Sequence, residues 1–447
     1  MSLSLGQKAG WGLADMGIAV FVVVKQLLVL AFLNTYLGVP IALAGSLTTA
    51  VLIFDIISDP LIGYLSDRTS SRWGRRAPWM FVGAVVLALC MIGIFAVPQG
   101  FSTLGNMLWV GAFFVLATIG FTMVAIPYGA MVGEITTNPQ ERSQMTAWRM
   151  GFASVGILIG GAVIPLIAGD SRQGHVTAAM AVAPLIIAAI WLSLWATRRA
   201  PRHASPSIGS IGANFKLVFA NGAFVRLTLL YGVMTLAIAI ITAGLPFAAL
   251  YLILDNGQTL LSGAASALSV LSLMFAAFVV GSILSQAVWV WVSARLGKLN
   301  ALVLGLALYI ILLIALFTQL PSVNVTAIAG MFVLAGMTNG AYQQIPWAMY
   351  PDLMDITAAE TGETIEGAFS GLWLFGQKLA NALAPQVLGL ILAAYGWQET
   401  TQGRVDQTDA AVTALHVSMT LAPAAILAVA IAGLVLIYRP AVRHGIS

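Results

Sequence analysis

The sequence predicts an all-α membrane protein with twelve transmembrane helices in two six-helix halves. Of its 447 residues, 60% are hydrophobic and 8% are charged, and the mean hydropathy is +0.95. Soluble domains carry about 25% charged residues, so this composition excludes a soluble globular domain of this length. Apolar runs of about 20 residues, long enough to cross hydrocarbon as a helix, recur along the whole chain.

Twelve such runs define the predicted spans, in chain order, as residues 9–37, 41–66, 79–97, 105–132, 147–169, 177–197, 223–254, 264–294, 300–319, 323–350, 366–397 and 410–437. The longest polar connection, residues 197–221, divides them six and six. We therefore expect an N-terminal half at 1–197, a cytoplasmic connecting loop at 198–222 and a C-terminal half at 223–447.

Basic residues predict the orientation of these spans. Of the 20 Lys and Arg residues, 15 lie in segments that share one side of the membrane if both termini lie on that side. The positive-inside rule then places both termini in the cytoplasm. Residues 1–12 lack the pattern of a cleaved signal peptide, so the first span is expected to be retained. The single cysteine, Cys90, excludes an intramolecular disulfide framework.

A short internal repeat supports the division into halves. Ile126-Pro127-Tyr128 in the fourth span recurs as Ile345-Pro346-Trp347 in the tenth, and an acidic residue follows each motif. The fourth and tenth spans are equivalent in a six-plus-six duplication. Two six-helix halves with proline-bearing helices are the layout of secondary transporters.

Two aspartates four residues apart, Asp55 and Asp59, lie inside the second predicted span. Residues at this spacing share one helix face, and a second carboxylate there adds roughly 3 kcal/mol of repulsion at an effective dielectric near 20. The pair is therefore predicted to take up a proton or bind a metal ion. Ser58 adds a hydroxyl, which makes the set all oxygen, as a hard cation requires. Alternatively, each aspartate pairs with a basic residue of a neighbouring helix for packing alone.

Other charged residues lie in or at the edges of the spans: Asp15, Lys25, Arg149 and Lys378. Such residues are functional candidates because they must face a cavity or a partner. Asp15 is either functional or a solvated helix end, and Lys25 either snorkels or pairs with an acid. Lys378, with Trp373 five residues earlier, is expected to pair with the aspartates or to bind a substrate anion.

A basic loop at residues 67–79 follows the second span and anchors it on the cytoplasmic side. It also suggests a gate, in which Asp67 and Arg75 or Arg76 pair with acids of the next cytoplasmic loop when the inner side closes. Such ion pairs are weak when hydrated, which suits a contact that breaks in every cycle. The residues assigned to this gate are Asp67, Arg75, Arg76, Glu134, Glu141 and Arg142.

These residues resemble the glycoside/pentoside/hexuronide:cation symporter family, the branch of the major facilitator superfamily that includes the melibiose carriers. The resemblance covers nearly the whole chain. It rests on residues 12–17, 55–60, Gly63, 67–79, 126–130, Glu134, Thr136, Glu141, Arg142 and Arg149, and on Asp352, Asp355, Thr361, Gly362, Glu366, Gly367 and Lys378. It implies the major facilitator fold and cation-coupled symport, with Na⁺ or H⁺, across a bacterial cytoplasmic (inner) membrane.

The resemblance also implies site residues. Those matching the family's coupling-cation ligands are Asp55, Ser58, Asp59 and Thr122, with Asp55 and Asp59 as the metal ligands. Arg149 and Lys378 match basic positions that line the family's central cavity, and we assign them to substrate binding. Beside the resemblance, we also assign Trp373, Asp15 and Tyr128 to substrate binding. Melibiose carriers have Asn where this chain has Ser58, which leaves the choice between Na⁺ and H⁺ open.

Departures from melibiose carriers point to a different substrate. Ala19, Ala125 and Gly129 stand where those carriers have two sugar-binding acids and a stacking Trp. A neutral galactoside is thus disfavoured, and an anionic uronide or sulfonated sugar is favoured. Thr364 and Ile365 replace the basic residues that are usual between Thr361-Gly362 and Glu366-Gly367, so the family's inner-gate contact there is not expected.

Two alternatives remain beside a sugar symporter: a lysolipid or lipid symporter, and a non-transporting membrane assembly factor on the same fold. An enzyme is not expected, because the sequence shows no metal-ligand cluster, nucleophile motif or phosphate loop. We expect no cofactor besides the coupling ion, no nucleic-acid partner, and a monomer in the lipid bilayer. The substrate itself stays open.

Overall fold

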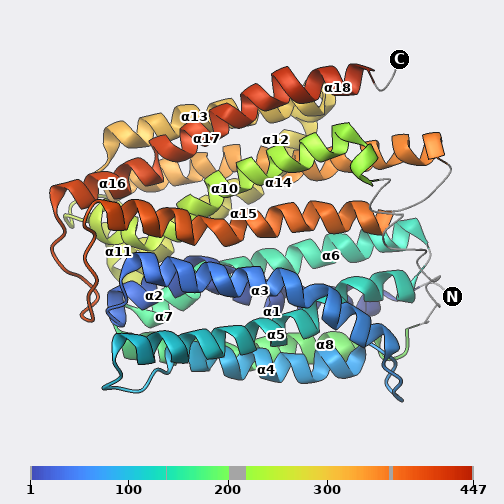
Figure 1. The fold of residues 1–447 in the computed structure, drawn as a ribbon, viewed down its shortest axis with the longest axis horizontal. Coiled ribbons are helices and arrows are strands. Elements are labelled where there is room, and N and C mark those ends of the chain that lie inside the picture. Colours follow the sequence, from blue (N-terminus) through green and yellow to red (C-terminus); the bar gives the residue numbers. More distant parts are fainter. Residues whose placement is uncertain (1–2, 137, 201–217, 362–365, 445–447) are drawn as a thin grey trace. The chain divides into compact units, whose positions relative to one another are not determined.

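The computed structural model describes residues 3–136, 138–200, 218–361 and 366–444, and helices make up nearly all of this part of the chain (Figure 1). Its contacts divide it into two units. Unit 1 comprises Met1–Pro206 and Gln398–Asp406, and unit 2 comprises Ser207–Trp397 and Gln407–Ser447. The boundary near residue 206 lies inside the predicted connection at 198–222.

Within the residues that the structure describes, units 1 and 2 each contain six long helical stretches. The elements of unit 1 are α1 (Leu5–Leu27), α2 (Val29–Tyr36), α3 (Ile41–Arg68), α4 (Ala77–Phe95), α5 (Thr103–Ile135), α6 (Pro139–Leu158), the π-helical turn η1 (Ile159–Val163), α7 (Ile164–Ala168) and α8 (Arg172–Thr197). Helix α1 packs against α6 and α8, α3 against α5, and α4 against α5 and α8.

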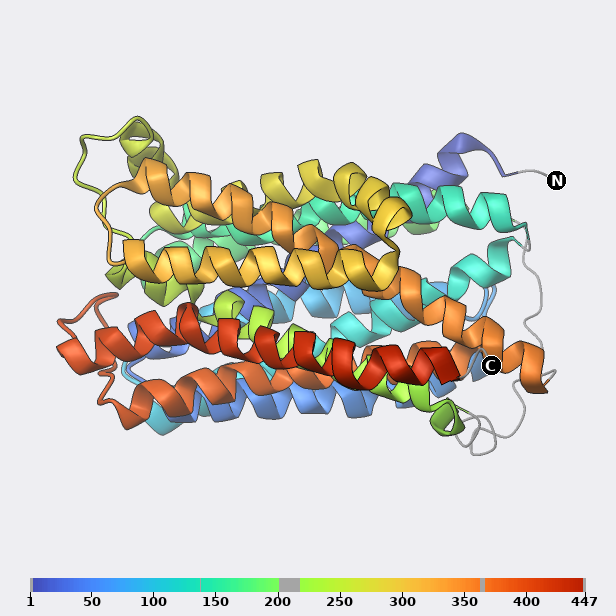
Figure 2. The ribbon, with the colours of Figure 1, turned by 90° about the horizontal axis from the view of Figure 1, so that it is seen from above.

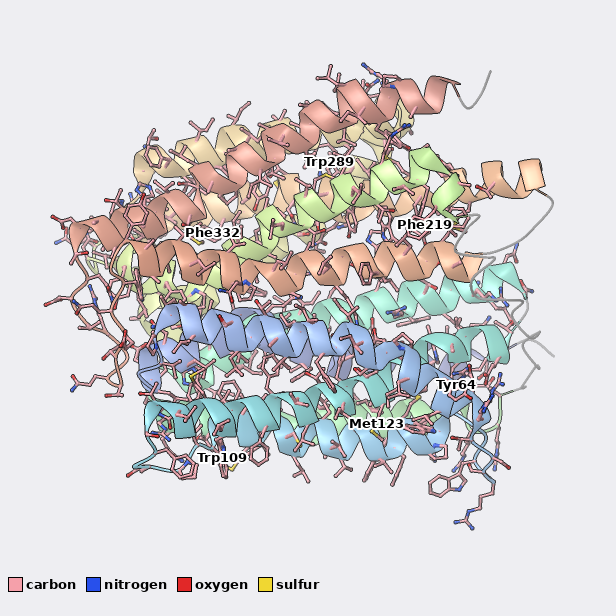
Figure 3. All side chains as sticks on the ribbon, viewed as in Figure 1. Tyr64, Trp109, Met123, Phe219, Trp289 and Phe332 are labelled. Atoms are coloured by element: carbon pink, nitrogen blue, oxygen red, sulfur yellow. The ribbon has the colours of Figure 1, made fainter. Side chains whose placement is uncertain are left out.

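Unit 2 contains the other six of these described stretches. Its elements are α10 (Gly222–Tyr251), α11 (Ser262–Leu268), α12 (Val270–Leu296), α13 (Lys298–Gln319), α14 (Val325–Thr361), α15 (Glu366–Ala394), α16 (Asp409–Met419), α17 (Leu421–Gly433), η2 (Leu434–Tyr438) and α18 (Arg439–His444). Within this unit α13 and α14 lie side by side (Figure 2). Trp289 of α12, which is labelled in Figure 3, donates its indole N–H to Met337 O of α14 at 2.6 Å.

The predicted spans correspond to these stretches. Eleven helices in the described part of the chain are long and apolar enough to cross a membrane. The remaining predicted span, 366–397, forms α15, a helix of 29 residues. An all-α membrane fold is therefore confirmed.

Several helix boundaries differ from the prediction. The span expected at 147–169 begins at Pro139, because the Asn138 side chain accepts from Gln140 N at 2.9 Å and caps the helix. The span expected at 323–350 continues to Thr361 through Pro346 and Pro351. The span expected at 264–294 is interrupted at Ser269, whose φ is 63°. Hydropathy marks the apolar part of a helix, whereas a cap sets its start.

Small residues bring α1 and α6 into close contact. A Cβ atom built on Gly12 would lie 2.9 Å from Arg149 N and 2.9 Å from Trp148 C. Farther along, one built on Gly160 would lie 2.9 Å from Val20 O. Small residues are what allow helix backbones to approach this closely in a membrane. The close contact at Gly12 places Arg149 within reach of the next turn of α1.

Candidate functional site

The two aspartates of α3 face one hydroxyl of α5. Thr122 Oγ1 lies 3.2 Å from Asp55 Oδ1 and 3.3 Å from Asp59 Oδ1. The four-residue spacing therefore aims both carboxylates at the same point, as predicted. Ser58 is buried beside them, but its hydroxyl donates to Asp55 O of its own helix at 3.0 Å. Asp55, Asp59 and Thr122 are thus brought together, while the Ser58 hydroxyl is engaged with the backbone.

Lys25 of α1 completes this cluster. Its Nζ lies 2.9 Å from Asp55 Oδ2, and the two side chains are only 5% and 3% exposed. The ammonium also lies 4.3 Å from the centre of the Phe121 ring, within cation–π distance. Of the two expectations for Lys25, pairing with an acid is observed and snorkelling is not. The sequence signal was a lysine inside an apolar run, but it did not identify the partner.

A second ion pair joins α1 to α6. Arg149 Nε donates to Asp15 Oδ2 at 3.0 Å, and the Asp15 side chain is 8% exposed. The solvated-helix-end interpretation of Asp15 is therefore wrong, because the close α1–α6 contact buries it. The Arg149 guanidinium lies 5.5 Å from the centre of the Tyr128 ring, and that ring stacks on Trp11 at 4.6 Å. Asp15, Arg149 and Tyr128 are thus brought together.

The loop after α3 is held by Glu134 at the end of α5. Glu134 Oε1 lies 2.6 Å from Arg75 Nη2 and 2.7 Å from Arg76 Nε, and Arg76 also contacts Asp67 Oδ1 at 2.7 Å. The expectation of hydrated pairs is wrong for Arg76–Glu134, whose side chains are 7% and 5% exposed, whereas the Arg75 and Asp67 side chains are 32% and 52% exposed. Glu134 lies at the end of α5, Asp67 near the end of α3, and Arg76 directly before α4, so the ends of three helices meet at this cluster.

Glu141 and Arg142 do not join this cluster. Glu141 accepts from Thr136 Oγ1 at 2.6 Å and from Leu3 N at 2.8 Å, and Lys8 Nζ lies 3.6 Å away. Arg142 Nε donates to Thr136 O at 3.0 Å. The predicted pairing of Glu141 with Arg75 or Arg76 is therefore wrong in this structure. The early start of α6 turns Glu141 toward the N-terminal segment instead.

The predicted substrate residues of unit 2 lie on α15. Trp373 is fully buried and stacks on Tyr231 at 4.3 Å and on Tyr350 at 5.0 Å. Its ring is therefore part of an aromatic core rather than open for stacking on a sugar. Gln377 donates to Tyr231 Oη at 3.1 Å, and Lys378 is half-buried. The predicted departures at Thr364 and Ile365, with Gly362 beside them, lie outside the described residues.

The side chains of these candidate sites offer carboxylates, hydroxyls and basic groups to a bound ion or solute. Among the described residues, no group of three or more His, Cys, Asp or Glu side chains is arranged to hold a metal ion. The carboxylate pair with Thr122 is an all-oxygen set, the ligand type of a small hard cation, and the Lys25 ammonium lies against one of its carboxylates.

Comparison with known proteins identifies the family. A model of the family described as MFS/sugar transport protein matches residues 10–439. The chain belongs to this family. It is therefore a membrane transporter of the major facilitator fold, related to cation symporters, and not an enzyme.

Relatives in this family carry different solutes. The chain is 24% identical to the putative glycoside/cation symporter YagG of Escherichia coli (strain K12), covering 88% of this chain and 83% of that protein. It is 24% identical to the isoprimeverose transporter of Lactiplantibacillus pentosus, covering 82% and 75%. It is 25% identical to the sodium-dependent lysophosphatidylcholine symporter 1-A of Danio rerio, covering 89% and 79%.

Solved structures agree on the fold. A bacterial homologue of the human drug peptide transporters PepT1 and PepT2 matches with a TM-score of 0.68 at 12% identity, covering 98% of this chain and 99% of that chain. A bacterial homologue of the human lysosomal transporter Spinster matches with a TM-score of 0.64 at 17% identity, covering 98% and 97%. At these identities the likeness concerns the fold alone.

Proposed function

We propose that the protein carries an anionic sugar or glycoside, such as a uronide or a sulfonated sugar, together with a cation by alternating access. The proposed substrate class rests on the partly exposed side chain of Arg149. Its Nε is bound to Asp15, yet its side chain is 38% exposed. A guanidinium has five N–H donors, so the terminal ones remain for a carboxylate or sulfonate.

The surroundings of Arg149 support the same substrate class. Asp15 fixes the guanidinium by one edge, and the Tyr128 ring lies against it. On α5, a Cβ built on Gly129 meets nothing within 4 Å. The chain thus provides a held basic group and open space, without the two sugar-binding acids of melibiose carriers at Ala19 and Ala125. These features favour an acidic solute over a neutral galactoside.

We assign cation coupling to Asp55, Asp59 and Thr122, with Ser58 beside them. The two carboxylates meet at one hydroxyl inside a membrane-spanning segment, where charge must be compensated. Lys378 and Trp373 remain proposed substrate-side residues of unit 2, and we propose that Trp373 acts by holding α15 in place. The cluster of Asp67, Arg75, Arg76 and Glu134 is proposed as the inner gate.

Counterflow of labelled solutes in proteoliposomes tests the function. Vesicles loaded with a glucuronide, a sulfonated sugar, a neutral glycoside or a lysolipid are compared for exchange with the same labelled compound. We expect exchange of the two acidic sugars and little exchange of the neutral one. Exchange of the neutral glycoside alone, or no exchange of either acidic sugar, would contradict the proposed substrate class.

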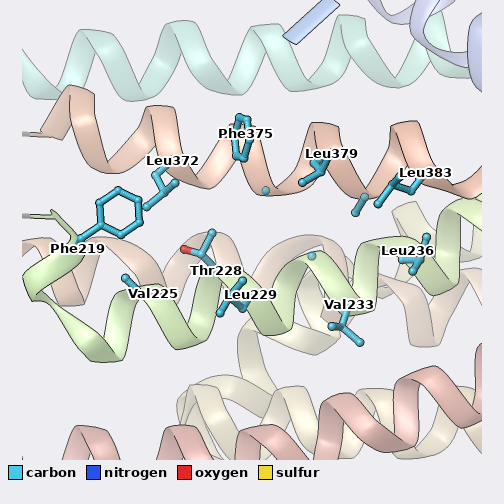
Figure 4. Close-up of a pocket in the computed structure, with 13 residues that line it drawn as sticks. Phe219, Val225, Thr228, Leu229, Val233, Leu236, Leu372, Phe375, Leu379 and Leu383 are labelled. Atoms are coloured by element: carbon cyan, nitrogen blue, oxygen red, sulfur yellow. The ribbon is translucent and has the colours of Figure 1, made fainter. Parts of the chain in front are cut away.

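A lysolipid is the second candidate substrate because unit 2 carries an apolar groove (Figure 4). The groove has a volume of about 390 Å³ and runs between α10 and α15. Its lining includes Leu229, Leu236, Phe375, Leu379 and Leu383. An acyl chain is the solute part that such a lining would hold. Replacing Leu379 by Gln is expected to reduce lysolipid counterflow and to leave acidic-sugar counterflow unchanged if the groove serves the lipid.

A further inference from the structure

We propose that Lys25 is the resident cation of the Asp55/Asp59 pair, so that the wild-type protein does not use Na⁺, and that removing its ammonium group opens a sodium site. This inference rests on the proposed assignment of the pair to cation coupling. It also leaves the proton as the coupling ion of the wild-type protein. The basis is contact geometry and charge balance within unit 1.

The contacts of Asp55 place the Lys25 ammonium directly against one carboxylate of the pair. One carboxylate oxygen, Oδ2, lies 2.9 Å from Lys25 Nζ. The other, Oδ1, lies 3.2 Å from Thr122 Oγ1, which is also 3.3 Å from Asp59 Oδ1. An ammonium has three donors and a single positive charge, so at Asp55 it supplies the charge that a monovalent ion would supply.

The position of Lys25 on the chain keeps the ammonium at this place. Lys25 lies near the middle of the first helical stretch, three residues before the one-residue break at Leu28 that separates α1 from α2. Its Nζ lies 4.3 Å from the centre of the Phe121 ring and 5.7 Å from that of Phe21. The side chain is 5% exposed. Two aromatic rings and a carboxylate thus surround a tethered cation that does not diffuse away.

Charge balance explains why its removal would recruit an ion. With Lys25 present, the cluster carries two carboxylates and one ammonium. With Lys25 replaced by Met, two carboxylates remain on one helix face, and one has lost a buried partner, which is strongly unfavourable. The oxygens of Asp55, Asp59 and Thr122 are hard ligands that Na⁺ accepts. Sodium bound to these oxygens then restores the lost charge beside Asp55.

Sodium binding to the purified protein in detergent tests this without any substrate. The variants are Lys25→Met, which removes the charge at similar length, and Lys25→Arg, which keeps it. The double variant Lys25→Met/Asp55→Asn removes the proposed site as well. Lys298→Met is the matched control, since Lys298 pairs with Asp352 at 2.6 Å on unit 2. The readouts are binding of radioactive ²²Na⁺ and the shift in Tm between NaCl and choline chloride.

We expect saturable Na⁺ binding only in Lys25→Met, with a rise in Tm of roughly 2–3 °C when Na⁺ reaches about 100 times its Kd. Wild type, Lys25→Arg, the double variant and Lys298→Met should show no saturable response. Saturable Na⁺ binding by wild type that Asp55→Asn abolishes would overturn the proposal. So would a folded Lys25→Met protein that binds no Na⁺, or a gain of Na⁺ binding in Lys25→Arg.

The outcomes separate this inference from the proposed function. If Lys25→Met does not fold, the wild-type and Lys25→Arg titrations still decide, because both must be indifferent to Na⁺. If acidic sugars show no counterflow while Na⁺ binding follows the expected pattern, the substrate assignment fails and the role of Lys25 stands. If acidic sugars exchange but wild type binds Na⁺ through Asp55, the substrate assignment stands and the proposed role of Lys25 fails.

Discussion

In unit 1, the ion pairs of individual acidic residues determine which basic side chains are available to bind a solute. Three buried acids, Asp15, Asp55 and Glu134, each pair with a basic side chain from a different segment. Leaving one member of such a pair alone costs about 3–5 kcal/mol. Arg149 differs from Lys25 in its exposure, 38% against 5%. This exposure is the basis on which we propose that Arg149 binds a substrate anion while it keeps Asp15 as its partner.

Replacing Arg149 by Lys should weaken binding of an acidic sugar more than binding of its neutral analogue. Lysine keeps the charge but loses the planar fork that holds Asp15 and a second anion together. We expect roughly a tenfold loss in affinity for the acidic sugar, equivalent to about 1.4 kcal/mol. Competition of unlabelled sugars against counterflow measures both affinities. Equal losses for the two analogues would indicate a packing or gating effect instead.

Replacing Asp59 by Asn should abolish uphill accumulation and preserve exchange. The change removes one charge from the cluster, whereas Thr122 can still donate to the amide oxygen. Asp55→Asn should have the same transport effect and a lower Tm, because it leaves the Lys25 ammonium without this carboxylate. Gradient-driven uptake and counterflow are measured on the same vesicles. Normal accumulation in both variants would refute coupling through the pair.

At the scale of the helices, sequence periodicity predicted which residues share one face of a helix. It did not predict which residues of a neighbouring helix contact that face. The span predicted at 41–66 is α3, Ile41–Arg68, and its register placed Asp55 and Asp59 on one face. The partner of Asp55 comes from α1, and neither hydropathy nor spacing identifies a neighbouring helix. The burial of Trp373 was missed for the same reason, because its aromatic neighbours Tyr231 and Tyr350 lie on other helices.

The contact of α1 with α6 should be sensitive to side-chain size at Gly12. In Gly12→Ala the new Cβ would lie 2.9 Å from Arg149 N, so the helices must separate and the Asp15–Arg149 pair lengthens. We expect a loss of about 1–3 kcal/mol in stability and weaker binding of the acidic sugar. Gly151→Ala on α6 is the control, because a Cβ there meets nothing within 4 Å. Similar effects of the two changes on Tm and affinity would contradict this role.

The stability of the ion-pair cluster at the end of α5 should depend on the Glu134 carboxylate. In Glu134→Gln, Arg75 and Arg76 lose a shared, nearly buried carboxylate, although Arg76 keeps Asp67. We expect a stability loss of about 3 kcal/mol and faster proteolysis of the loop at 67–79. Asp352→Asn is the matched control, because Asp352 pairs with Lys298 at an exposed site. Proteolysis of this loop at the wild-type rate would argue against a gate held by Glu134.

At the scale of the whole molecule, composition and apolar runs were sufficient to predict the fold class, whereas the family was predicted from motifs such as residues 55–60 and 126–130. A hydrophobic content of 60% with twelve apolar runs fixed a polytopic membrane protein, and the match over residues 10–439 agrees. Orientation follows from charge distribution alone and stays a prediction. Residues 398–406 belong to unit 1, where Thr400 N donates to Asn34 O at 3.0 Å. Hydropathy contains no signal for such a long-range contact.

Cysteine labelling in intact cells tests the predicted orientation. In a Cys90→Ser background, a single cysteine replaces Ser71 in the basic loop or Gln402 in the segment that contains Arg404. If the basic loop is cytoplasmic, an impermeant maleimide should label Gln402→Cys and not Ser71→Cys until the cells are opened. The reverse pattern would invert the assigned topology, including the placement of both termini.

The pairing of Lys25 with Asp55 also constrains how the protein is made. The two residues are 30 positions apart, and α1 leaves the ribosome first. At synthesis rates of about 5–20 residues per second, Lys25 waits roughly 2–6 seconds for its partner. During that interval a lysine near the middle of a span costs about 2.5–3.5 kcal/mol in the bilayer. Helix α1 is therefore expected to stay beside the insertion machinery until α3 arrives, and the two helices enter the lipid together.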